Sequence, residues 1–344
     1  MRNIFYVKYV FYVISRVSFR NRCTQNYIAH STSYSLVLLF NYYIIIMDTN
    51  KIINADSIEH LKTLDENVFD SCVTDPPYHL QSIAKRFTNS TEAKYGKDGS
   101  FQRLSKGFMG KEWDGGDIAF QKDFWQEVYR TLKPGAVLLA FAATRNYHRM
   151  AVAIEDAGFE IFDMINWIYG SGFPKRRNLL KPAHEPIVMA RKGINPPLNL
   201  DECRVGDEVF DTSKNVRKEA MNKKAVYQLG LKEDYKGTIV KGRWPANIIH
   251  SGLDTDWADF FYCAKANKKE KGDTEHPTVK PLDLMKYLVR LVTPENGLVL
   301  DPFAGTGTTG EAAMLENRKY YLIEKTKDYI KDIERRVEKS TLPC

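Results

Sequence analysis

A tetrapeptide that combines a carboxylate, two prolines and an aromatic ring, Asp75-Pro76-Pro77-Tyr78, directly follows residues 68–74, which read as a buried strand. The prolines remove backbone donors and stiffen the turn, while the backbone carbonyls stay available as acceptors. The carboxylate of Asp75 and the carbonyl of Pro76 could each accept one N–H from an amino group of a planar base, on which Tyr78 could stack. The alternative is a proline-rich turn that Asp75 merely caps. The tetrapeptide therefore indicates chemistry at an amino group on a planar ring.

A second motif, DPFAGTGTTG at residues 301–310, follows an apolar strand and opens a helix. Glycines let the backbone pass close to a ligand, and a helix start offers free N–H groups. Glu324 ends the next predicted strand, where a carboxylate can accept both hydroxyls of a ribose. The spacing of its three glycines also matches a dinucleotide fingerprint. Taken alone, the motif leaves open an NAD-dependent oxidoreductase and a tight turn without a ligand.

The elements around these motifs alternate between strands and helices, which is typical of a doubly wound α/β sheet. Strands are predicted at residues 52–56, 68–74, 136–141, 160–167, 186–190, 298–300 and 320–323. Helices are predicted at residues 123–132, 146–157, 282–292, 308–316 and 327–337. Residues 79–118 form a polar stretch that is too long for a passive connection, so we expect a functional loop there.

The alternation fades between residues 192 and 275, which indicates an inserted or separate module. Residues 213–243 hold nine Lys or Arg and three acidic residues. A solvated charged surface is the alternative to a binding surface. The predicted organisation is one half of an α/β domain at 47–191, the module at 192–275 and the other half at 276–344.

The whole chain has a net charge of +7, but the first 46 residues supply five of these charges, because they contain five basic residues and no acidic residue. Overall basicity is therefore a weak argument for nucleic-acid binding. Because composition changes at Met47, we expect residues 1–46 to be a non-native or disordered extension that precedes the true start. A transit peptide and an ordinary extension are the alternatives.

Cysteine usage and hydropathy exclude several classes of protein. None of the five cysteines forms a Cys-x-x-Cys pair, which argues against a disulfide framework and a cysteine-rich zinc site, so no metal is expected. No apolar run reaches 18 residues, which argues against a membrane span. We expect a protein of the reducing cytoplasm.

Together the two motifs resemble those of the amino-group DNA methyltransferases, with the catalytic tetrapeptide first, as in the beta class of that family. The resemblance covers roughly residues 52–338. Further similar segments are GFMGKEWD at 107–114, LKPG at 132–135, WIYGSGFPK at 167–175, GRWPAN at 242–247 and HPTVKP at 276–281. The resemblance implies a Rossmann-like methyltransferase fold with permuted motif order. It also implies a catalytic half at 47–191, a target-recognition module at 192–275 and a cofactor-binding half at 276–344.

The resemblance also implies a role for each matching residue. Asp75, Pro76, Pro77 and Tyr78 match the catalytic tetrapeptide. The positions that match binding of S-adenosyl-L-methionine are Asp301, Phe303, Gly305 and Gly307, with Glu324 on the ribose, Asp56 at the adenine, and Thr278 and Lys280 along the methionine moiety. No metal ligand is implied.

The implied activity is transfer of a methyl group to a base that is flipped out of double-stranded DNA. Adenine N6 is the expected target because position 75 is Asp, whereas members that methylate cytosine N4 more often carry Ser there. Cytosine N4 stays the alternative. A methyltransferase that acts on protein glutamine would carry Asn at position 75, and a non-catalytic DNA-binding protein need not keep both motifs. A cognate restriction endonuclease and a homodimer are partners to test.

Overall fold

The computed structural model describes residues 49–78, 117–170, 180–193, 198–211, 239–251, 261–262, 265–266, 271, 274 and 278–341. The described residues from Asn50 onward belong to one compact unit. The expectations for residues 1–46 and for the loop at 79–118 fall almost entirely outside the described residues.

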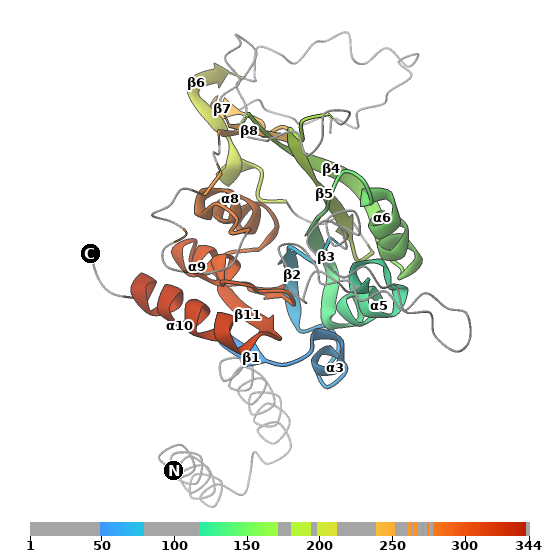
Figure 1. Ribbon diagram of the computed structural model, residues 1–344. Helices are drawn as coiled ribbons and strands as arrows, with labels where there is room; N and C mark the ends of the chain where they lie inside the picture. The colour runs from blue at the N-terminus through green and yellow to red at the C-terminus, as the bar shows by residue number, and fades with distance from the viewer. Residues whose placement is uncertain are drawn as a thin grey trace, which may run out of the picture. The chain divides into compact units, whose positions relative to one another are not determined.

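A nine-stranded sheet forms the centre of the molecule, in the order β1-β11-β10-β2-β3-β5-β4-β8-β9 (Figure 1). Its strands are β1 (Lys51–Asn54), β2 (Phe69–Thr74), β3 (Leu132–Phe141), β4 (Glu160–Tyr169), β5 (His184–Arg191), β8 (Ile248–Ser251), β9 (Phe261–Tyr262), β10 (Leu298–Asp301) and β11 (Lys319–Glu324). Among them only β5 runs against the others, because its pairings with β3 and β4 are antiparallel and all other pairings are parallel. The predicted doubly wound, mostly parallel sheet is confirmed.

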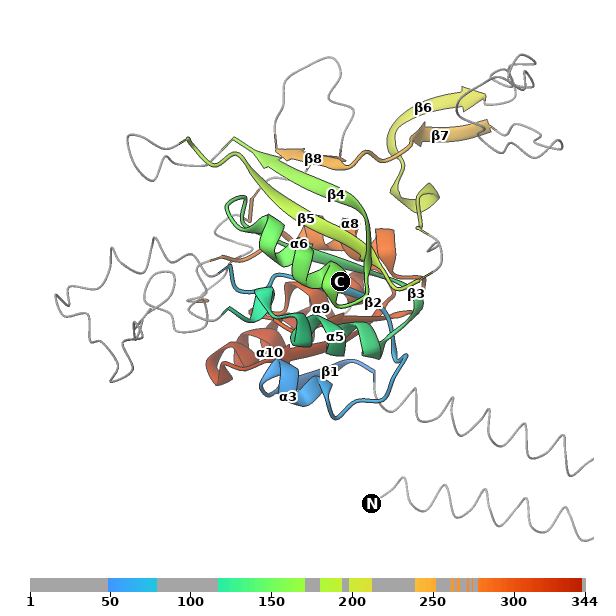
Figure 2. The same cartoon turned by 90° about the vertical axis from the view of Figure 1, so that its right-hand side faces the viewer.

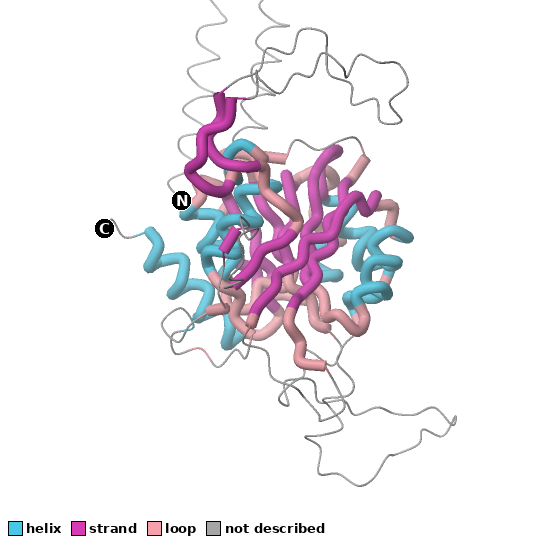
Figure 3. The backbone as a smooth tube through the Cα atoms, turned by 90° about the horizontal axis from the view of Figure 1, so that it is seen from above, coloured by secondary structure: helices cyan, strands magenta, loops and turns pink. Residues whose placement is uncertain are grey.

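Helices cover both faces of this sheet (Figure 3). One face carries α3 (Ser57–Leu61), α5 (Lys122–Thr131), α6 (Tyr147–Asp156) and the short helix η3 (Ile118–Phe120). The other carries α8 (Leu282–Val292), α9 (Thr308–Leu315), α10 (Lys327–Thr341) and the short helix η4 (Asp201–Cys203).

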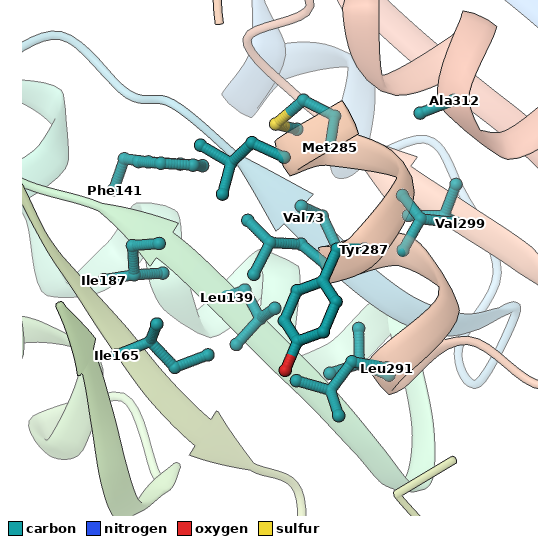
Figure 4. Close-up of a cluster of buried hydrophobic side chains, with 14 of the residues drawn as sticks. Val73, Leu139, Phe141, Ile165, Ile187, Met285, Tyr287, Leu291, Val299 and Ala312 are labelled. Atoms are coloured by element: carbon teal, nitrogen blue, oxygen red, sulfur yellow. The ribbon is translucent and has the colours of Figure 1, made fainter. Parts of the chain in front are cut away.

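The alternation of side chains along β3 explains why both layers form. Val137, Leu139 and Phe141 join the core on the α8 side, whereas Leu138 and Ala140 join the core on the α5 side. A strand buried on both faces reads as a continuous apolar run, as this one does. Figure 4 shows Met285, Tyr287 and Leu291 of α8 pointing at the strands of this core. The two cores therefore hold the sheet between its two helical layers.

The bounds of two strands, β1 and β3, differ from the sequence-based expectation. β1 ends at Asn54 instead of residue 56, because Asp56 is the N-cap of α3 and accepts the N–H of Glu59 at 3.5 Å. β3 begins at Leu132, four residues before the predicted start, because Pro134 and Gly135 lie within the strand instead of ending the helix before it. Gly135 has a positive φ of 83°, and the pairing of β2 with β3 shifts register there.

The region at 192–275 contributes to two sheets. β6 (Val205–Asp211) and β7 (Ile239–Arg243) form a separate antiparallel pair, but β8 and β9 extend the central sheet beside β4 (Figure 2). β8 has only four residues and β9 two, which is too short for a recognisable period in the sequence. The expected module is therefore not wholly separate from the α/β core.

No described helix combines the length and the apolar character that a membrane crossing requires. Among the described residues there is also no group of three His, Cys, Asp or Glu side chains that could hold a metal ion.

Candidate active site

The point where the sheet reverses its winding lies between β10 and β2. From β2 the chain passes through α5 to β3 on one side, and from β10 it passes through α9 to β11 on the other. Ligands of such sheets bind outside the carboxyl ends of the strands at this point. Asp75 follows β2, and residue 301 ends β10. Thr74 Oγ1 donates a hydrogen bond to Asp301 Oδ1 at 2.8 Å, so motifs that are far apart in the sequence meet at this edge.

Asp301 uses its carboxylate to hold the glycine loop. It also accepts a hydrogen bond from Thr309 Oγ1 at 2.5 Å and one from the backbone N–H of Phe303 at 3.1 Å. The side chain is buried, and burial raises the pKa of its carboxyl to about 6 although hydrogen bonds from Thr309 and Thr74 act in the opposite direction. The Asp301 carboxylate therefore holds the shape of the glycine loop.

Glu324 closes the loop from the neighbouring strand. Its Oε2 accepts the N–H of Gly305 at 2.9 Å, and its Oε1 accepts the N–H of Thr326 at 2.7 Å. The side chain is nearly buried, and burial raises its pKa even though these N–H groups lower it. Each carboxylate oxygen has a second lone pair. These acceptors fit the two hydroxyls of a ribose.

Two further positions give the loop its shape. Gly307 has a φ of 80°, which L side chains rarely adopt, and a Cβ there would come within 2.8 Å of Ile333 Cγ2. Phe303 is half-buried, and its ring packs on Phe124 with 5.1 Å between centroids. A partly exposed aromatic ring suits the adenine of a nucleoside cofactor.

The tetrapeptide residues lie at the adjoining part of the same edge. Pro76 and Pro77 are buried, and Asp75 and Tyr78 are half-buried. The Tyr78 hydroxyl donates to Asp75 Oδ1 at 2.7 Å, so this tyrosine contacts the carboxylate as well as offering a ring. Burial, followed by the negative charges of Asp75 and Glu185, raises the pKa of Tyr78 well above its ordinary value. The hydroxyl thus stays protonated and able to donate.

Lys280 is expected along the methionine part of the cofactor, and the structure places its ammonium against Asp75. Lys280 Nζ donates to Asp75 Oδ2 and lies 3.4 Å from Glu185 Oε2. Burial lowers the pKa of Lys280, but the two carboxylates outweigh burial and the net shift is upward. Lys280 is therefore charged in the site.

The other two expected cofactor residues lie further out. Thr278 is exposed, two residues before Lys280. Asp56 follows β1, which is separated from β10 by β11, and it forms an ion pair of 3.0 Å with Lys325.

Several residues that the structure brings to the tetrapeptide are absent from the sequence-based prediction. Glu185 lies near the start of β5, and because β5 is antiparallel its amino end reaches the edge where the parallel strands have their carboxyl ends. Its Oε1 lies 3.5 Å from the hydroxyl of Tyr169, which ends β4. Asn146 Nδ2 donates to the carbonyl of Tyr78. The only signal for Glu185 is an acid at the head of a strand, and the direction of that strand is not visible in the sequence.

Comparisons with known proteins agree with this geometry. A family model described as DNA methylase, N6_N4_Mtase, matches residues 69–335. The chain is 29% identical to the type II methyltransferase M.HindIII of Haemophilus influenzae, over 80% of this chain and 90% of that one. It is 26% identical to the type II methyltransferase M.HpaI of Haemophilus parainfluenzae, over 84% and 74%.

The fold is similar to that of the solved structure of the cytosine-N4-specific PvuII DNA methyltransferase. The TM-score is 0.51 at 18% sequence identity, and the match covers 85% of this chain and 90% of that one. With the catalytic tetrapeptide and the glycine loop joined at one sheet edge and the family model spanning most of the sequence, the chain belongs to the DNA methylase family.

Proposed function

We propose that this DNA methyltransferase transfers the methyl group of S-adenosyl-L-methionine to N6 of adenine in a specific sequence of double-stranded DNA. The single observation that carries the proposal is the hydrogen bond between Thr74 and Asp301, which sets the tetrapeptide beside the glycine loop. The family match also decides between the two uses of the glycine spacing, in favour of methyl transfer over NAD-dependent oxidation.

The cofactor-binding residues fit a nucleoside with an exposed sulfonium. Glu324 offers acceptors for the ribose hydroxyls, Phe303 offers a ring for the adenine, and the Gly305 turn brings the backbone close. The bound cofactor supplies an electrophilic methyl group. Asp301 and Thr309 keep the loop in this shape.

The tetrapeptide residues would orient the acceptor nitrogen. A base inside a duplex cannot reach this edge, so it must leave the stack at a cost of a few kcal/mol. The lone pair of its amino nitrogen is delocalised into the ring, which makes that nitrogen a weak nucleophile. Hydrogen bonds from the amino group to Asp75 and to the carbonyl of Pro76 would align the lone pair and stabilise the positive charge that grows on nitrogen. Such a reaction needs no covalent intermediate with the protein.

The names of the similar proteins also suggest partners. M.HindIII and M.HpaI are called type II methyltransferases, which supports site-specific methylation and raises a cognate restriction endonuclease as a partner. A homodimer is the second partner to test, by light scattering of the purified protein. Because a DNA methyltransferase must reach DNA, we propose that the protein is cytoplasmic.

Sequencing the DNA of cells that make the protein tests the proposal directly. A host without its own DNA methylation should acquire N6-methyladenine at one short sequence when it expresses the wild-type protein, and none when it expresses Asp75→Ala. Methylation of cytosine N4 at one sequence would replace the adenine assignment. DNA without any new modification from a folded, well-expressed protein would refute the proposal.

A further inference from the structure

A buried ammonium lies between two carboxylates at the tetrapeptide. Lys280 Nζ contacts Asp75 Oδ2 and lies 3.4 Å from Glu185 Oε2, and it sits over the ring of Phe141 at 4.7 Å. The side chains of Lys280, Glu185 and Asp75 are 9%, 19% and 22% exposed. With little water around them, these charges interact strongly.

Both oxygens of the Asp75 carboxylate already have partners. Tyr78 donates its hydroxyl to Oδ1, and Lys280 donates to Oδ2. An ammonium in contact with a carboxylate cancels most of its negative charge. Each oxygen keeps a second lone pair, but the full negative charge of Asp75 is available to an amino group only when Lys280 moves away from it.

One oxygen of Glu185 faces both partners. Glu185 Oε2 lies 3.4 Å from Lys280 Nζ and 3.4 Å from the hydroxyl of Tyr78. Lys280 Nζ is also 3.3 Å from the Tyr78 hydroxyl, so the two donors can shift together. A short movement would bring both within full hydrogen-bonding distance of Glu185.

The net charge of the cluster gives a second reason for a movement of Lys280 from Asp75 toward Glu185. Asp75 and Glu185 carry two negative charges and Lys280 one positive charge, so the cluster keeps one net negative charge. A positive charge that develops on the acceptor nitrogen is stabilised by that surplus. Without the charge of Glu185 the cluster would be neutral, and Lys280 would stay on Asp75.

From this geometry we infer that Glu185 is a positioning residue, which takes over Lys280 and the Tyr78 hydroxyl when Asp75 turns to the amino group of the base. The inference rests on the proposed transfer to an amino group, whichever base carries it. Asp75 is the group that touches the base, and Glu185 acts through Lys280 and Tyr78.

The test is a cycle of variants in single-turnover methyl transfer at saturating cofactor and DNA. Glu185→Gln keeps the shape but removes the charge, and we expect the rate to fall about ten- to a hundredfold with little change in cofactor affinity. Glu185→Asp keeps the charge and should retain most of the rate. Glu185→Gln combined with Lys280→Met returns the cluster to one net negative charge, and the double variant should be faster than Glu185→Gln alone.

A merely structural Glu185 would give the opposite pattern. A double variant that is as slow as Glu185→Gln or slower, or a Glu185→Gln variant at the wild-type rate, would overturn the inference. Glu160→Gln is the matched control, because Glu160 is an exposed carboxylate paired with Arg191 at the other end of β5. Loss of transfer in the wild type and in Glu160→Gln as well would instead refute the proposed function.

Discussion

Asp75, Asp301 and Glu324 are carboxylates at one edge of a single sheet, yet their partners differ. Asp301 accepts from β2, from the glycine loop and from α9, Glu324 accepts two backbone N–H groups, and Asp75 accepts from a lysine and a tyrosine. Asp301 is therefore suited to holding the loop, Glu324 to binding a ligand and Asp75 to the reaction. Substitutions should separate these three properties.

Replacing Asp75 should damage the chemical step most. Asp75→Ala removes a charged acceptor that strengthens its bond in the transition state, so the single-turnover rate should fall roughly a hundred- to a thousandfold. Asp75→Asn keeps one acceptor oxygen and should lie between Ala and wild type. Cofactor affinity should be nearly unchanged because the glycine loop is intact, and DNA affinity should change little because phosphate contacts dominate it. A near-normal rate in Asp75→Ala would mean that Asp75 only caps the turn.

Replacing Glu324 should weaken cofactor binding. A hydrogen bond from a ribose hydroxyl to a charged group is worth about 1.5–3 kcal/mol, so Glu324→Ala should lower affinity roughly ten- to a hundredfold in calorimetry. DNA affinity serves as the control and should be unchanged. Because Glu324 also accepts the N–H groups of Gly305 and Thr326, the melting temperature of the variant must be measured as well. An unchanged cofactor Kd would remove Glu324 from the ribose site.

Asp301 predicts a pH dependence of stability. Its pKa is about 6 in the folded protein and near 3.8 when unfolded, so between these values the folded state holds a proton that the unfolded state has lost. The free energy of unfolding therefore falls as pH rises from about 4 to 6, by about 3 kcal/mol for this group. Asp301→Asn does not titrate, so its stability relative to wild type should improve by that amount between pH 4 and 7 in urea unfolding. Parallel curves would contradict the raised pKa.

At the scale of whole elements, the sequence predicts the strands and helices that carry a clear period. The strand at 68–74 and the helix at 282–292 match β2 and α8 closely, because Phe69, Cys72 and Val73 mark a buried strand and the apolar residues of α8 recur at helical spacing. The four-residue β8 has too few residues to show a period, and it was assigned to the module instead of the sheet. Which strands are neighbours in the sheet is also invisible in the sequence, so the pairing of β10 with β2 is known only from the structure.

The same limit applies to the candidate site. The tetrapeptide and the glycine loop are local signals, so their residues could be named from the sequence. Glu185 reaches them only because β5 is antiparallel to β3, and Thr74 and Thr309 matter only because they both donate to Asp301. Such contacts depend on strand order and direction, which no local pattern encodes.

The junction between the glycine loop and α10 gives a prediction for an element. Gly307→Ala combines a positive φ with a Cβ that would lie 2.8 Å from Ile333 Cγ2 and 3.2 Å from Ile333 Cα. Strain should cost about 1–2 kcal/mol and overpacking a further 1–3 kcal/mol. Gly193→Ala is the matched control, since Gly193 has a φ of 77° but nothing within 4 Å of a Cβ, so only strain applies. Equal losses for both variants in urea unfolding would mean that α10 does not press on the loop.

At the scale of the whole molecule, the arrangement of strands limits where a target-recognition module can begin and end. β8 is parallel to β4 and thereby to β2 and β10, so the hairpin of β6 and β7, which leads into β8, joins the sheet at the edge opposite Asp75. β8 and β9 are part of the central sheet. An exchange of residues 192–275 with a relative would remove two strands of the core, so an exchange that tests target choice should leave Ile248–Ser251 and the strand after it in place.

The connection between β6 and β7 allows a sharper test of DNA binding. Residues 212–238 contain seven Lys or Arg and three acidic residues, a net charge of +4 out of the chain's +7. Asp211 and Ile239 face each other in the antiparallel register, so an Asn-Gly turn can replace residues 212–238 and keep the hairpin. We expect cofactor affinity and melting temperature to stay near wild type, because the central sheet and the glycine loop are untouched.

DNA binding should respond strongly to that replacement. Affinity should fall at least about tenfold at moderate salt, and the slope of log affinity against log salt should flatten by about 0.9 for each phosphate contact that is lost. A second variant that keeps the length but converts the seven basic residues to Gln separates charge from chain length, and it should show the same flattened slope. Fluorescence anisotropy of a labelled duplex between 50 and roughly 200 mM salt measures both quantities. If both variants keep the wild-type slope, the positive charge of this segment does not face DNA, and the phosphate contacts must come from basic residues at the edge that holds Asp75.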